Sequence, residues 1–503
     1  MRKQRSSEYR GFRNAGIRLD EDVLPDVEEH RSDRVLKTLY SVHAFDKAHL
    51  VMLAEESLIP KADAAAMLSV LRESEQEGTE QVRLRVGGGN HSGEQMLIRR
   101  LGEEVGGRIH LGRSSGDLGA ISRRIPQRDR VLEVLGEINR VREMFLTMAA
   151  EHVETIMPGY TFGQHAQPIT LAHYLIASAA VLERDFERGL ALYRRTNQSP
   201  AGAAIMAGSD FPLNRHRTSE LLGFDQPIRN TFDAIQTGDV SLEAFCFLAV
   251  LNNSVGRWAD DIVLWSTSEF GTVDIPDRFC GTSSIMMQKK NPYGPQYVKG
   301  MASMSLGALV VGFHVDKGPT GVPALERQYA GELLWRLFDD TVRDLRWWRQ
   351  LMPEVRWNTK LMRRRAGEFW AQATDIAGAL VRDKNMSWRT AHQIVGILVR
   401  YGYERGFGPG DVTPALLDEA AVEYMGEPVH LSKESLRRAL DPEHFVRSRT
   451  LYGGPAPEEA RRQIDEYRAR LARDDGEVAA ARRHLEESRA KLEAAVDAVL
   501  ASA

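Results

Sequence analysis

Residues 281–296, which read GTSSIMMQKKNPYGPQ, gather side chains that could move a proton or bind an anion. The stretch holds two serine hydroxyls, two lysine ammonium groups and an asparagine amide, and its glycine and proline residues break helix and strand patterns alike. Its few apolar residues do not form the face of an element. We therefore expect a loop, and loops held by a rigid scaffold are where enzymes place much of their chemistry.

Three further loops carry polar groups between glycine or proline residues. They read VGGGNHSGE at 86–94, HLGRSSGD at 110–117 and MPGYTFGQHAQPIT at 157–170. Most of the remaining chain has apolar residues at steps of three and four, which is typical of amphipathic helices. The sequence thus predicts a helical enzyme whose chemistry lies in the loops between long helices.

Motifs for other kinds of chemistry are incomplete in these loops. The triple glycine at 87–89 has no following G-K-[ST] and no preceding strand, which argues against a nucleotide site. The histidines lack the H-x-x-x-H spacing of a helix-borne metal site, and the paired serines lack a G-x-S-x-G elbow. Lys290 reads plausibly as a solvated loop lysine, a reading that is weaker for Lys289. We expect no metal and no cofactor.

The helical pattern predicts an all-α fold. Several predicted helices exceed 20 residues and have broad apolar faces, which suits a bundle whose core is completed by other subunits. Short runs such as EQVRLRV at 80–86 could form a minor strand. The apolar stretch at 301–315 is short for a membrane span and is interrupted by Ser and Gly, so we expect a helix buried on all sides in a core or a subunit interface. The amphipathic segment 475–500 reads as a solvated outer helix.

Composition excludes several classes of protein. The 503 residues include 66 basic and 70 acidic side chains, for a net charge of −4, which argues against a protein that coats nucleic acid or an anionic membrane. The two cysteines read as reduced core thiols of a cytosolic protein. The basic N-terminus has no apolar segment behind it and does not read as a signal peptide. We expect a cytoplasmic protein that acts on a small molecule.

The loop at 281–296 resembles the signature of the fumarase/aspartase superfamily, and its Q-K-K-N-P core resembles argininosuccinate lyases. The resemblance runs over essentially the whole chain. The segments that match in order are HLGRSSGD, PGYTFGQHAQPITLAHYL, AGAAIMAGSDFPLNR, TFDAIQTGD, ATDIAGALVRD and LDPEHFVRSRTLYGGPAPEEARRQ. Six ordered matches are strong evidence of kinship.

The resemblance implies an architecture of three helical domains, with a long central bundle that assembles a homotetramer. We place the N-terminal domain at 1–113, the bundle domain at 114–364 and the C-terminal domain at 365–503. Each active site would gather loops from three subunits, and the helix at 301–315 would meet other subunits.

The resemblance also implies a chemistry, the β-elimination of fumarate from a succinyl group. A serine is a poor base unless cations and backbone N–H groups stabilise its alkoxide, and Ser283 matches the family's catalytic serine. Lys289 and Asn291 match residues that hold the substrate carboxylate as it gains charge. The glycines and Pro292 would let the loop close and exclude water. The residues assigned to catalysis or substrate binding are Arg113, Ser114, Ser115, Thr161, Gln164, Ser283, Lys289, Asn291 and Gln328.

Two departures from argininosuccinate lyase lie where a proton would be delivered. The family's histidine after the Thr is Phe162 here, and the glutamate that pairs with that histidine is Gln296. Because both partners of one pair are lost together, we expect a changed mechanism. His165, or water held by Thr161 and Gln164, could supply the proton, and for His165 a structural role is about as plausible.

Other departures lie at the far end of the substrate pocket. Gly238 stands where the family has Arg, while Pro323 and Gly331 stand where it has Tyr and Lys. In HLGRSSGD the family's Arg-Asn pair becomes Ser115-Gly116. These losses would leave the guanidinium half of argininosuccinate with several polar partners missing.

Three interpretations follow from these departures. A basic aliphatic amine needs no enzymic acid to leave, so the first is a carbon–nitrogen lyase that releases fumarate from an N-substituted aspartate, similar to ethylenediamine-disuccinate (EDDS) lyase and acting on aminopolycarboxylates. The second is argininosuccinate lyase itself, with the losses compensated elsewhere. The third is a non-catalytic structural descendant. Retention of Ser283, Lys289, Asn291, Thr161 and Asp239 argues against it.

Overall fold

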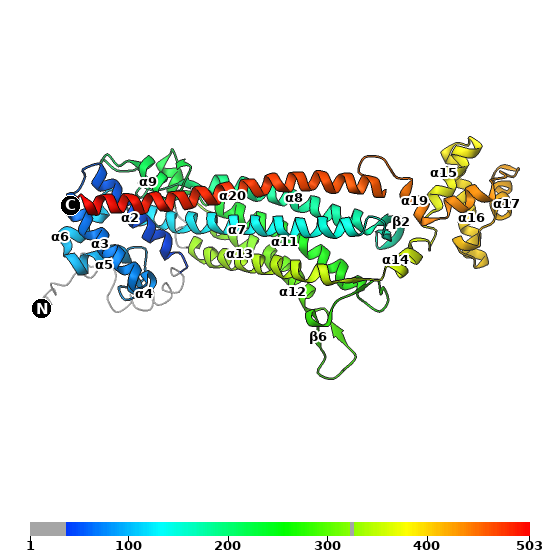
Figure 1. The fold of residues 1–503 in the computed structure, drawn as a ribbon, viewed down its shortest axis with the longest axis horizontal. Coiled ribbons are helices and arrows are strands. Elements are labelled where there is room, and N and C mark those ends of the chain that lie inside the picture. Colours follow the sequence, from blue (N-terminus) through cyan, green and yellow to red (C-terminus); the bar gives the residue numbers. More distant parts are fainter. Residues whose placement is uncertain (1–36, 322–325, 503) are drawn as a thin grey trace.

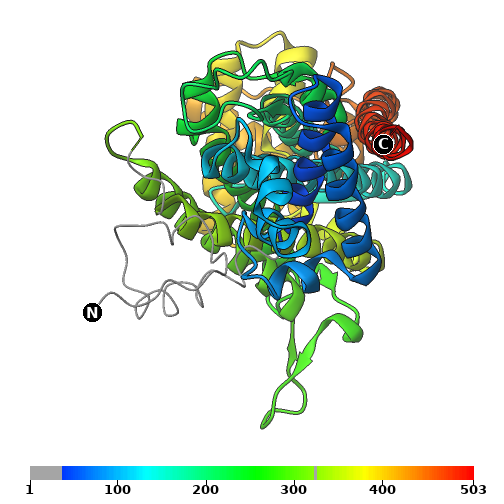
Figure 2. The same cartoon turned by 90° about the vertical axis from the view of Figure 1, so that its left-hand side faces the viewer.

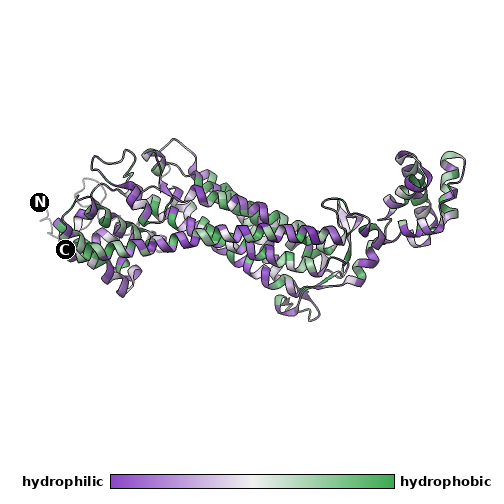
Figure 3. Ribbon diagram, turned by 45° about the horizontal axis from the view of Figure 1, so that its top comes forward, coloured by the Kyte–Doolittle hydropathy of each residue, from purple (hydrophilic) through white to green (hydrophobic). Residues whose placement is uncertain are grey.

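Long amphipathic helices dominate the molecule, as the apolar spacing predicts. We describe residues 37–321 and 326–502 of a computed structural model. They form an elongated body with a long helical bundle in the middle and a smaller helical domain at each end (Figures 1 and 2). Hydrophobic and hydrophilic residues alternate along the bundle helices (Figure 3). The predicted all-α fold is confirmed.

The helices differ widely in length. They are α2 (Leu39–Glu55), α3 (Lys61–Glu77), α4 (Thr79–Leu84), α5 (Ser92–Leu101), α6 (Glu103–Gly106), α7 (Ser115–Glu151), α8 (Leu171–Thr196), α9 (Arg215–Leu221), α10 (Thr231–Gln236), α11 (Asp239–Trp265), α12 (Tyr293–Asp316), α13 (Glu326–Leu351), α14 (Thr359–Ala366), α15 (Ala373–Lys384), α16 (Trp388–Arg405), α17 (Pro414–Met425), α18 (Lys433–Ala439), α19 (Pro442–Arg447) and α20 (Pro457–Ala501). Short 3₁₀ turns, η2 (Gly107–His110), η3 (Asp277–Phe279), η4 (Met352–Glu354) and η5 (Pro409–Asp411), connect them.

Within the described residues, strands occur only as short pairs at the edges of the helical body. They are β1 (Ile156–Thr161) with β2 (Gln164–Thr170), β3 (Gln198–Ser199) with β4 (Gln226–Pro227), β5 (Val273–Asp274) with β8 (Arg356–Trp357), and β6 (Gly281–Thr282) with β7 (Lys290–Asn291). All are antiparallel except the β3–β4 pair. The strand considered for EQVRLRV is wrong, because these residues begin in helix α4 and Arg83 is buried there.

Three large hydrophobic cores and two small clusters lie along the described part of the body. The first is formed by α2, α3, α5 and the first turns of α7, and the far end of α20 packs into it through residues such as Leu492 and Val496. The second runs the length of the bundle between α7, α8, α11, α12, α13 and α20. The third joins α15, α16, α17 and α18 at the opposite end. The domain boundaries predicted at 113/114 and 364/365 stay predictions. These boundaries place α20 in the C-terminal domain, whereas the helix runs back along the bundle (Figure 1).

Helix α20 is 45 residues long and carries the chain from the C-terminal end of the body back to the N-terminal end. Its buried positions include Leu471, Val478 and Leu485, each seven residues from the next, so one narrow stripe faces the bundle. Its remaining faces are largely exposed. The predicted solvated outer helix at 475–500 therefore lies on the outside of the bundle with one apolar stripe packed inward.

Helix α12 differs from the prediction for residues 301–315. It spans 24 residues, and by length and composition it could cross a membrane, but only 28% of its most apolar window is buried within this chain. Its inner face packs between α11 and α13, while Met304, Leu306, Val310 and Phe313 are exposed. Burial on all sides in the core of one chain is therefore wrong, burial in a subunit interface stays a prediction, and the helix presents an apolar outer face.

A buried polar contact ties three bundle helices together. The Asn252 amide on α11 donates hydrogen bonds to the hydroxyls of Ser305 on α12 and Thr341 on α13, both at 2.9 Å. All three residues are buried. Since a polar group buried without a partner costs free energy, this contact fixes the relative register of the helices.

Replacing Asn252 by alanine removes the shared donor, so the two buried hydroxyl oxygens lose the hydrogen bond that they accept and keep only those that they donate to backbone carbonyls. We expect Asn252→Ala to lower the free energy of unfolding by about 1–3 kcal/mol. Thermal unfolding at one fixed protein concentration measures the change, with Asn253→Ala as the matched control because Asn253 is exposed. Equal unfolding temperatures for the two variants would show that the contact does not stabilise the bundle.

Candidate active site

The loop at 281–296 projects from the side of the bundle. The β6–β7 pair forms its base, with Gly281 opposite Asn291 and Thr282 opposite Lys290, and the tip extends away from the helices (Figures 1 and 2). A side chain at Gly281 would overlap the ring of Tyr293, because a Cβ there would lie 2.0 Å from it. Glycine at 281 therefore lets the loop leave the bundle close to the start of α12.

Ser283 is held by its own loop. Its Oγ accepts hydrogen bonds from the backbone N–H groups of Met286 at 3.0 Å and Ile285 at 3.3 Å. Two N–H groups aimed at one hydroxyl oxygen would also stabilise that oxygen as an alkoxide. Ser284, next to it, is exposed and receives no such hydrogen bond within the described chain.

The two lysines of the loop differ in their surroundings. Lys290 makes ion pairs with Asp274 and Asp277, both at 2.8 Å. Lys289 is exposed and pairs with no group of the described residues. This difference agrees with the interpretation of Lys290 as a surface lysine and leaves the Lys289 ammonium available for a ligand.

The β1–β2 hairpin carries Thr161 and Gln164 at its tip. The two residues are paired across the turn and both are exposed. Phe162 and Gly163 form the turn with φ of 55° and 72°, the positive values that a tight two-residue turn requires. The Phe162 side chain is entirely exposed, so nothing in its own chain covers an apolar ring of this size.

His165 lies on the same hairpin but on its other face. It pairs with Tyr160 in the strand register, and its ring packs against the rings of Tyr160 and Phe369, with centroids 5.1 and 4.7 Å away. Burial lowers the pKa of His165. Because neighbouring residues of a strand point to opposite faces, His165 points away from Gln164, which favours its packing role over proton delivery beside Thr161.

The first turn of α7 holds Ser114 and Ser115. Ser114 is the N-cap residue, and it forms a capping box in which its own N–H donates to Asp117 Oδ1 at 2.9 Å. Burial raises the pKa of Asp117 to about 6, against the lowering effect of that hydrogen bond. Ser115 is exposed at the N-terminus of a 37-residue helix, where the N–H groups and the helix dipole favour an anion.

Arg113 is buried behind this turn instead of facing solvent. Its guanidinium donates to Asp46 Oδ1 at 2.6 Å, and Arg83 donates to the other carboxylate oxygen at 2.5 Å. Burial acts to raise the pKa of Asp46, but the two guanidiniums outweigh it and lower that pKa. This placement favours Arg113 as the residue that positions the loop before Ser114 and Ser115, not as a ligand of the substrate.

The remaining predicted residues lie on β7, at the start of α11, and on α12 and α13. Asn291 is half-buried at the base of the catalytic loop, and Gln296 is exposed on the first turn of α12. Gln328 lies on α13, but its side chain is outside the described part of the structure, as are Pro323 and the basic N-terminus. Gly238 and Gly331 line one cavity together.

The predicted groups lie in three separate places of one chain. Ser114 and Ser115 precede α7 and the Thr161 hairpin follows it, so a 37-residue helix of about 55 Å separates them. The Ser283 loop lies between, on the side of the bundle (Figure 1). The sequence grouped these residues into one site, and a single chain does not bring them together.

One cluster escaped the sequence analysis. His91 Nδ1 and His110 Nδ1 both contact Glu94 Oε2, at 3.2 and 3.0 Å, and the two rings stack. The three ligand atoms lie within 4.8 Å of one another and could hold a metal ion. Burial acts to raise the pKa of Glu94, but the histidine hydrogen bonds lower it to about 2. The histidines are far apart in sequence, so spacing alone gives no signal for the cluster.

Comparisons with known proteins agree on one family. A family model described as Lyase matches residues 19–307, and the model of the argininosuccinate lyase C-terminal region matches residues 370–447. The argininosuccinate lyase of Methanothermobacter thermautotrophicus is 37% identical over 424 residues, which cover 84% of this chain and 90% of that protein. The Methanosarcina barkeri argininosuccinate lyase is 36% identical and covers 92% of both chains.

A solved structure gives the same result in three dimensions. EDDS lyase in complex with formate superposes with a TM-score of 0.85 at 31% identity, covering 93% of both chains. A 3-carboxy-cis,cis-muconate lactonizing enzyme from Pseudomonas putida has a TM-score of 0.69 at 22% identity and shares the fold.

The buried group of Arg83, Asp46 and Arg113 yields a stability prediction. Asp46→Asn leaves two buried guanidiniums without a carboxylate, so we expect a loss of about 3–5 kcal/mol in the free energy of unfolding. Glu77→Gln is the control, because the Glu77–Arg85 pair is exposed and its loss should cost less than about 1 kcal/mol. Urea unfolding of both variants measures the difference.

The same group predicts a pH dependence. Because the folded-state pKa of Asp46 is lowered, its contribution is complete above the ordinary carboxyl pKa and is lost as the pH falls through the folded-state value. The wild type should therefore lose stability in acid more steeply than Asp46→Asn does. Parallel acid unfolding curves would contradict the assignment.

Proposed function

The chain belongs to the lyase family, in the argininosuccinate lyase-like branch of the fumarase/aspartase superfamily, and from this premise we propose that it is a carbon–nitrogen lyase. It would split an N-substituted aspartate into fumarate and an amine, reversibly and without a cofactor. The observation that carries the proposal is the Ser283 oxygen held by two backbone N–H groups on a loop that also bears Lys289.

The elimination follows from the proposed roles. Ser283, as the base, removes the proton from the carbon next to one carboxylate of the aspartate. The electrons of that C–H bond form the double bond of fumarate, and the electrons of the C–N bond leave with the nitrogen. An aliphatic amine is basic enough to enter the site protonated, so it can leave as a neutral amine without an enzymic acid.

Lys289 and Asn291 would hold the carboxylate on which negative charge develops. Lys289 offers a positively charged ammonium donor and Asn291 an amide donor. Neither side chain has an ion-pair partner among the described residues. A fixed donor aimed at such charge is worth about 3–4 kcal/mol of barrier. The exposed N-terminus of α7 at Ser115 would bind the other carboxylate.

We also propose that the site is shared between subunits of a homotetramer. The length of α7 supports this, because it keeps Ser115 and Thr161 about 55 Å apart in one chain. The exposed apolar face of α12 supports it as well, since Met304, Leu306 and Phe313 would be covered in a bundle of several copies. The exposed Phe162 would enter a site formed by other copies. Family membership further supports a cytoplasmic location.

Two candidate substrates fit the proposed reaction. The argininosuccinate lyases are the relatives of higher identity, which favours argininosuccinate. Phe162 and Gln296, together with the glycines at 238 and 331, favour an amine such as that of ethylenediamine-disuccinate, and the likeness to EDDS lyase supports this reading. We place the aminopolycarboxylate first, because an alkylammonium nitrogen carries its own proton into the site, whereas the charge of a guanidinium is delocalised and Phe162 has no proton to give.

A substrate panel separates these readings. The purified protein is incubated with argininosuccinate, and separately with fumarate plus diamines, amino acids or N-(2-aminoethyl)aspartate, and the change in fumarate absorbance is followed. Consumption of fumarate with an aliphatic amine supports the first reading and cleavage of argininosuccinate the second. No change with any compound would refute catalysis and favour a structural descendant.

Replacing Ser283 tests the assigned base. We expect Ser283→Ala to lower kcat by about a thousandfold or more, because the proton has no other acceptor, while the oligomer stays intact. Ser284→Ala is the matched control and should retain activity within about twofold, since Ser284 accepts no backbone hydrogen bond in the described loop. Equal activity of both variants would remove Ser283 from its role.

Mixing inactive variants tests the shared site. Ser283→Ala and Thr161→Ala should each be nearly inactive alone, yet coexpression of the two chains should restore about a quarter of the sites, because these residues come from different copies. Activity is compared with that of each variant and of a double variant in one chain. Absence of recovery in mixed tetramers would show that both residues serve one site from one chain.

A further inference from the structure

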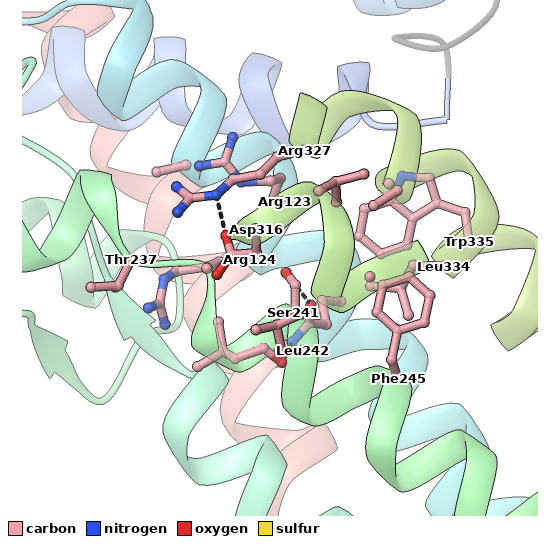
Figure 4. Close-up of a pocket in the computed structure, with 18 of the residues that line it drawn as sticks. Arg123, Arg124, Thr237, Ser241, Leu242, Phe245, Asp316, Arg327, Leu334 and Trp335 are labelled. Carbon is pink, nitrogen blue, oxygen red and sulfur yellow. Dashed lines mark hydrogen bonds and ion pairs between the residues drawn. The ribbon is translucent and has the colours of Figure 1, made fainter. Parts of the chain in front are cut away.

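A cavity between α7, α11, α12 and α13 is lined by an excess of positive charge. It encloses about 660 Å³, including its open mouth. Arg123, Arg124 and Arg327 line it, whereas Asp316 is the one acidic residue of its lining (Figure 4). Much of the remaining wall is apolar, with Phe245, Leu334 and Trp335 among the residues drawn. Cations beside apolar walls attract an anion strongly, because little water screens them.

The guanidinium groups of Arg123, Arg124 and Arg327 differ in the hydrogen bonds and ion pairs that they make. Arg327 is paired with Asp316. Arg124 donates to the carbonyl oxygens of Arg195 and Thr196, at 3.1 and 3.3 Å, where α8 ends. Arg123 makes no hydrogen bond or ion pair with the described residues. Burial, with the nearby charges of Arg327 and Arg124, lowers the pKa of Arg123 to about 10. Arg123 thus stays charged at neutral pH, and the nearby carboxylate of Asp316 is already paired with Arg327.

The cavity lies near the N-terminal end of α7, where Ser115 would bind a carboxylate. Ser115, Gly119 and Arg123 are spaced four residues apart, so they share one face of the helix. A Cβ at Gly119 would lie 3.5 Å from Arg123 Nη1, which means that the guanidinium reaches back one turn over the bare glycine. It therefore lies about 6 Å along the helix from Ser115, a span that a short substrate chain can bridge.

The two glycines that depart from the family pattern shape this cavity. A Cβ at Gly331 would meet nothing closer than 3.9 Å, so the missing side chain leaves open space. At Gly238 a Cβ would lie 2.2 Å from Asp316 Oδ1 and 3.1 Å from Arg327 Nε. The Arg327–Asp316 ion pair thus fills the space that a side chain at 238 would take. The guanidinium of Arg327, on α13, lies where the resemblance implies the guanidinium of an arginine at 238.

We propose that Arg123, supported by Arg327, binds a carboxylate on the amine half of the substrate. The inference rests on the proposed function and narrows its substrate class to aspartates whose nitrogen bears a second carboxylate-containing group. The amine halves of argininosuccinate and ethylenediamine-disuccinate, arginine and N-(2-aminoethyl)aspartate, both carry such a carboxylate, so the subsite serves either substrate reading. Arg123 is then a specificity residue that contacts the substrate away from the reacting atoms.

Pairs of amines that differ by their carboxylates test the subsite. Fumarate consumption is measured with N-(2-aminoethyl)aspartate against ethylenediamine, and with arginine against agmatine, which lacks the carboxylate. In the wild type the carboxylate-bearing amine of the accepted pair should be the better substrate. Arg123→Gln should lower kcat/KM for that amine by about 10- to 100-fold, as expected for a lost charged hydrogen bond, and change its partner by less than about twofold.

The conservative variant separates binding from structure. Arg123→Lys keeps the charge and should recover a large part of the lost kcat/KM, with the KM for fumarate unchanged in both variants. An equal loss on both members of a pair would assign Arg123 a structural role, and no loss on either would show that the carboxylate lies elsewhere. Either result overturns the proposal.

Failure of the proposed reaction would be visible separately. If the wild type consumes fumarate with no amine and cleaves no argininosuccinate, the function is refuted, and the subsite is then tested by calorimetric titration with N-(2-aminoethyl)aspartate. Binding weakened about tenfold or more by Arg123→Gln would keep the anion site. Equal binding by both proteins, or competition by inorganic phosphate at equal strength, would reject a carboxylate subsite at Arg123.

Discussion

The uninterrupted length of α7 is the constraint on which the rest of the molecule depends. Its 37 residues form a rod of about 55 Å that begins at the capping box of Ser114 and ends before the Thr161 hairpin. A rod cannot fold back, so groups at its two ends can meet only when copies of the chain lie side by side. For the proposed site, assembly would then be a condition of catalysis, and the apolar outer face of α12 would provide a surface for it.

The N-terminal end of this rod is held by charge. Arg83 and Arg113 share the buried carboxylate of Asp46, and the chain then passes from Arg113 directly into the cap of α7. Because the loop is fixed from behind, the exposed Ser115 and the free N–H groups of the first turn keep one orientation. Residues that a family motif groups together thus divide into those that hold the loop, such as Arg113, and those that are exposed, such as Ser115.

Much of the fold could be predicted from the sequence, since three- and four-residue apolar spacing reports helices directly. The loop of Ser283 could also be predicted from the sequence, because its composition argues against a helix or a strand. The helix that begins at Thr79 was missed, since alternation over EQVRLRV imitates a strand while tertiary packing buries Arg83. Burial of 301–315 could not be settled from one chain, because apolar residues do not say which copy covers them.

The resemblance implies a site built from loops of three subunits, but it does not give the distances between these groups within one chain. Motif order groups Ser115, Thr161 and Ser283, and it contains no information on the distance between the ends of a helix. The role of Arg113 depends on Asp46, which lies 67 residues earlier and in no shared motif. Contacts of this range, like those of Glu94 with two histidines, emerge only when the helices pack.

The departures from argininosuccinate lyase lie at both ends of the bound molecule and have a common consequence. At the hairpin, Phe162 stands where the resemblance implies a proton donor, so in the proposed reaction the leaving nitrogen would have to carry its own proton. At the cavity, Gly331 opens space and Arg327 restores a cation near the place of residue 238, so the far end of the leaving group can be larger and anionic. A basic amine that carries its own carboxylate satisfies both conditions. Arginine as a leaving group also has an anionic far end, because it carries a carboxylate. It meets the condition on the leaving nitrogen poorly, because the nitrogen bonded to the succinyl carbon is part of a delocalised guanidinium and is not protonated as an aliphatic amine is.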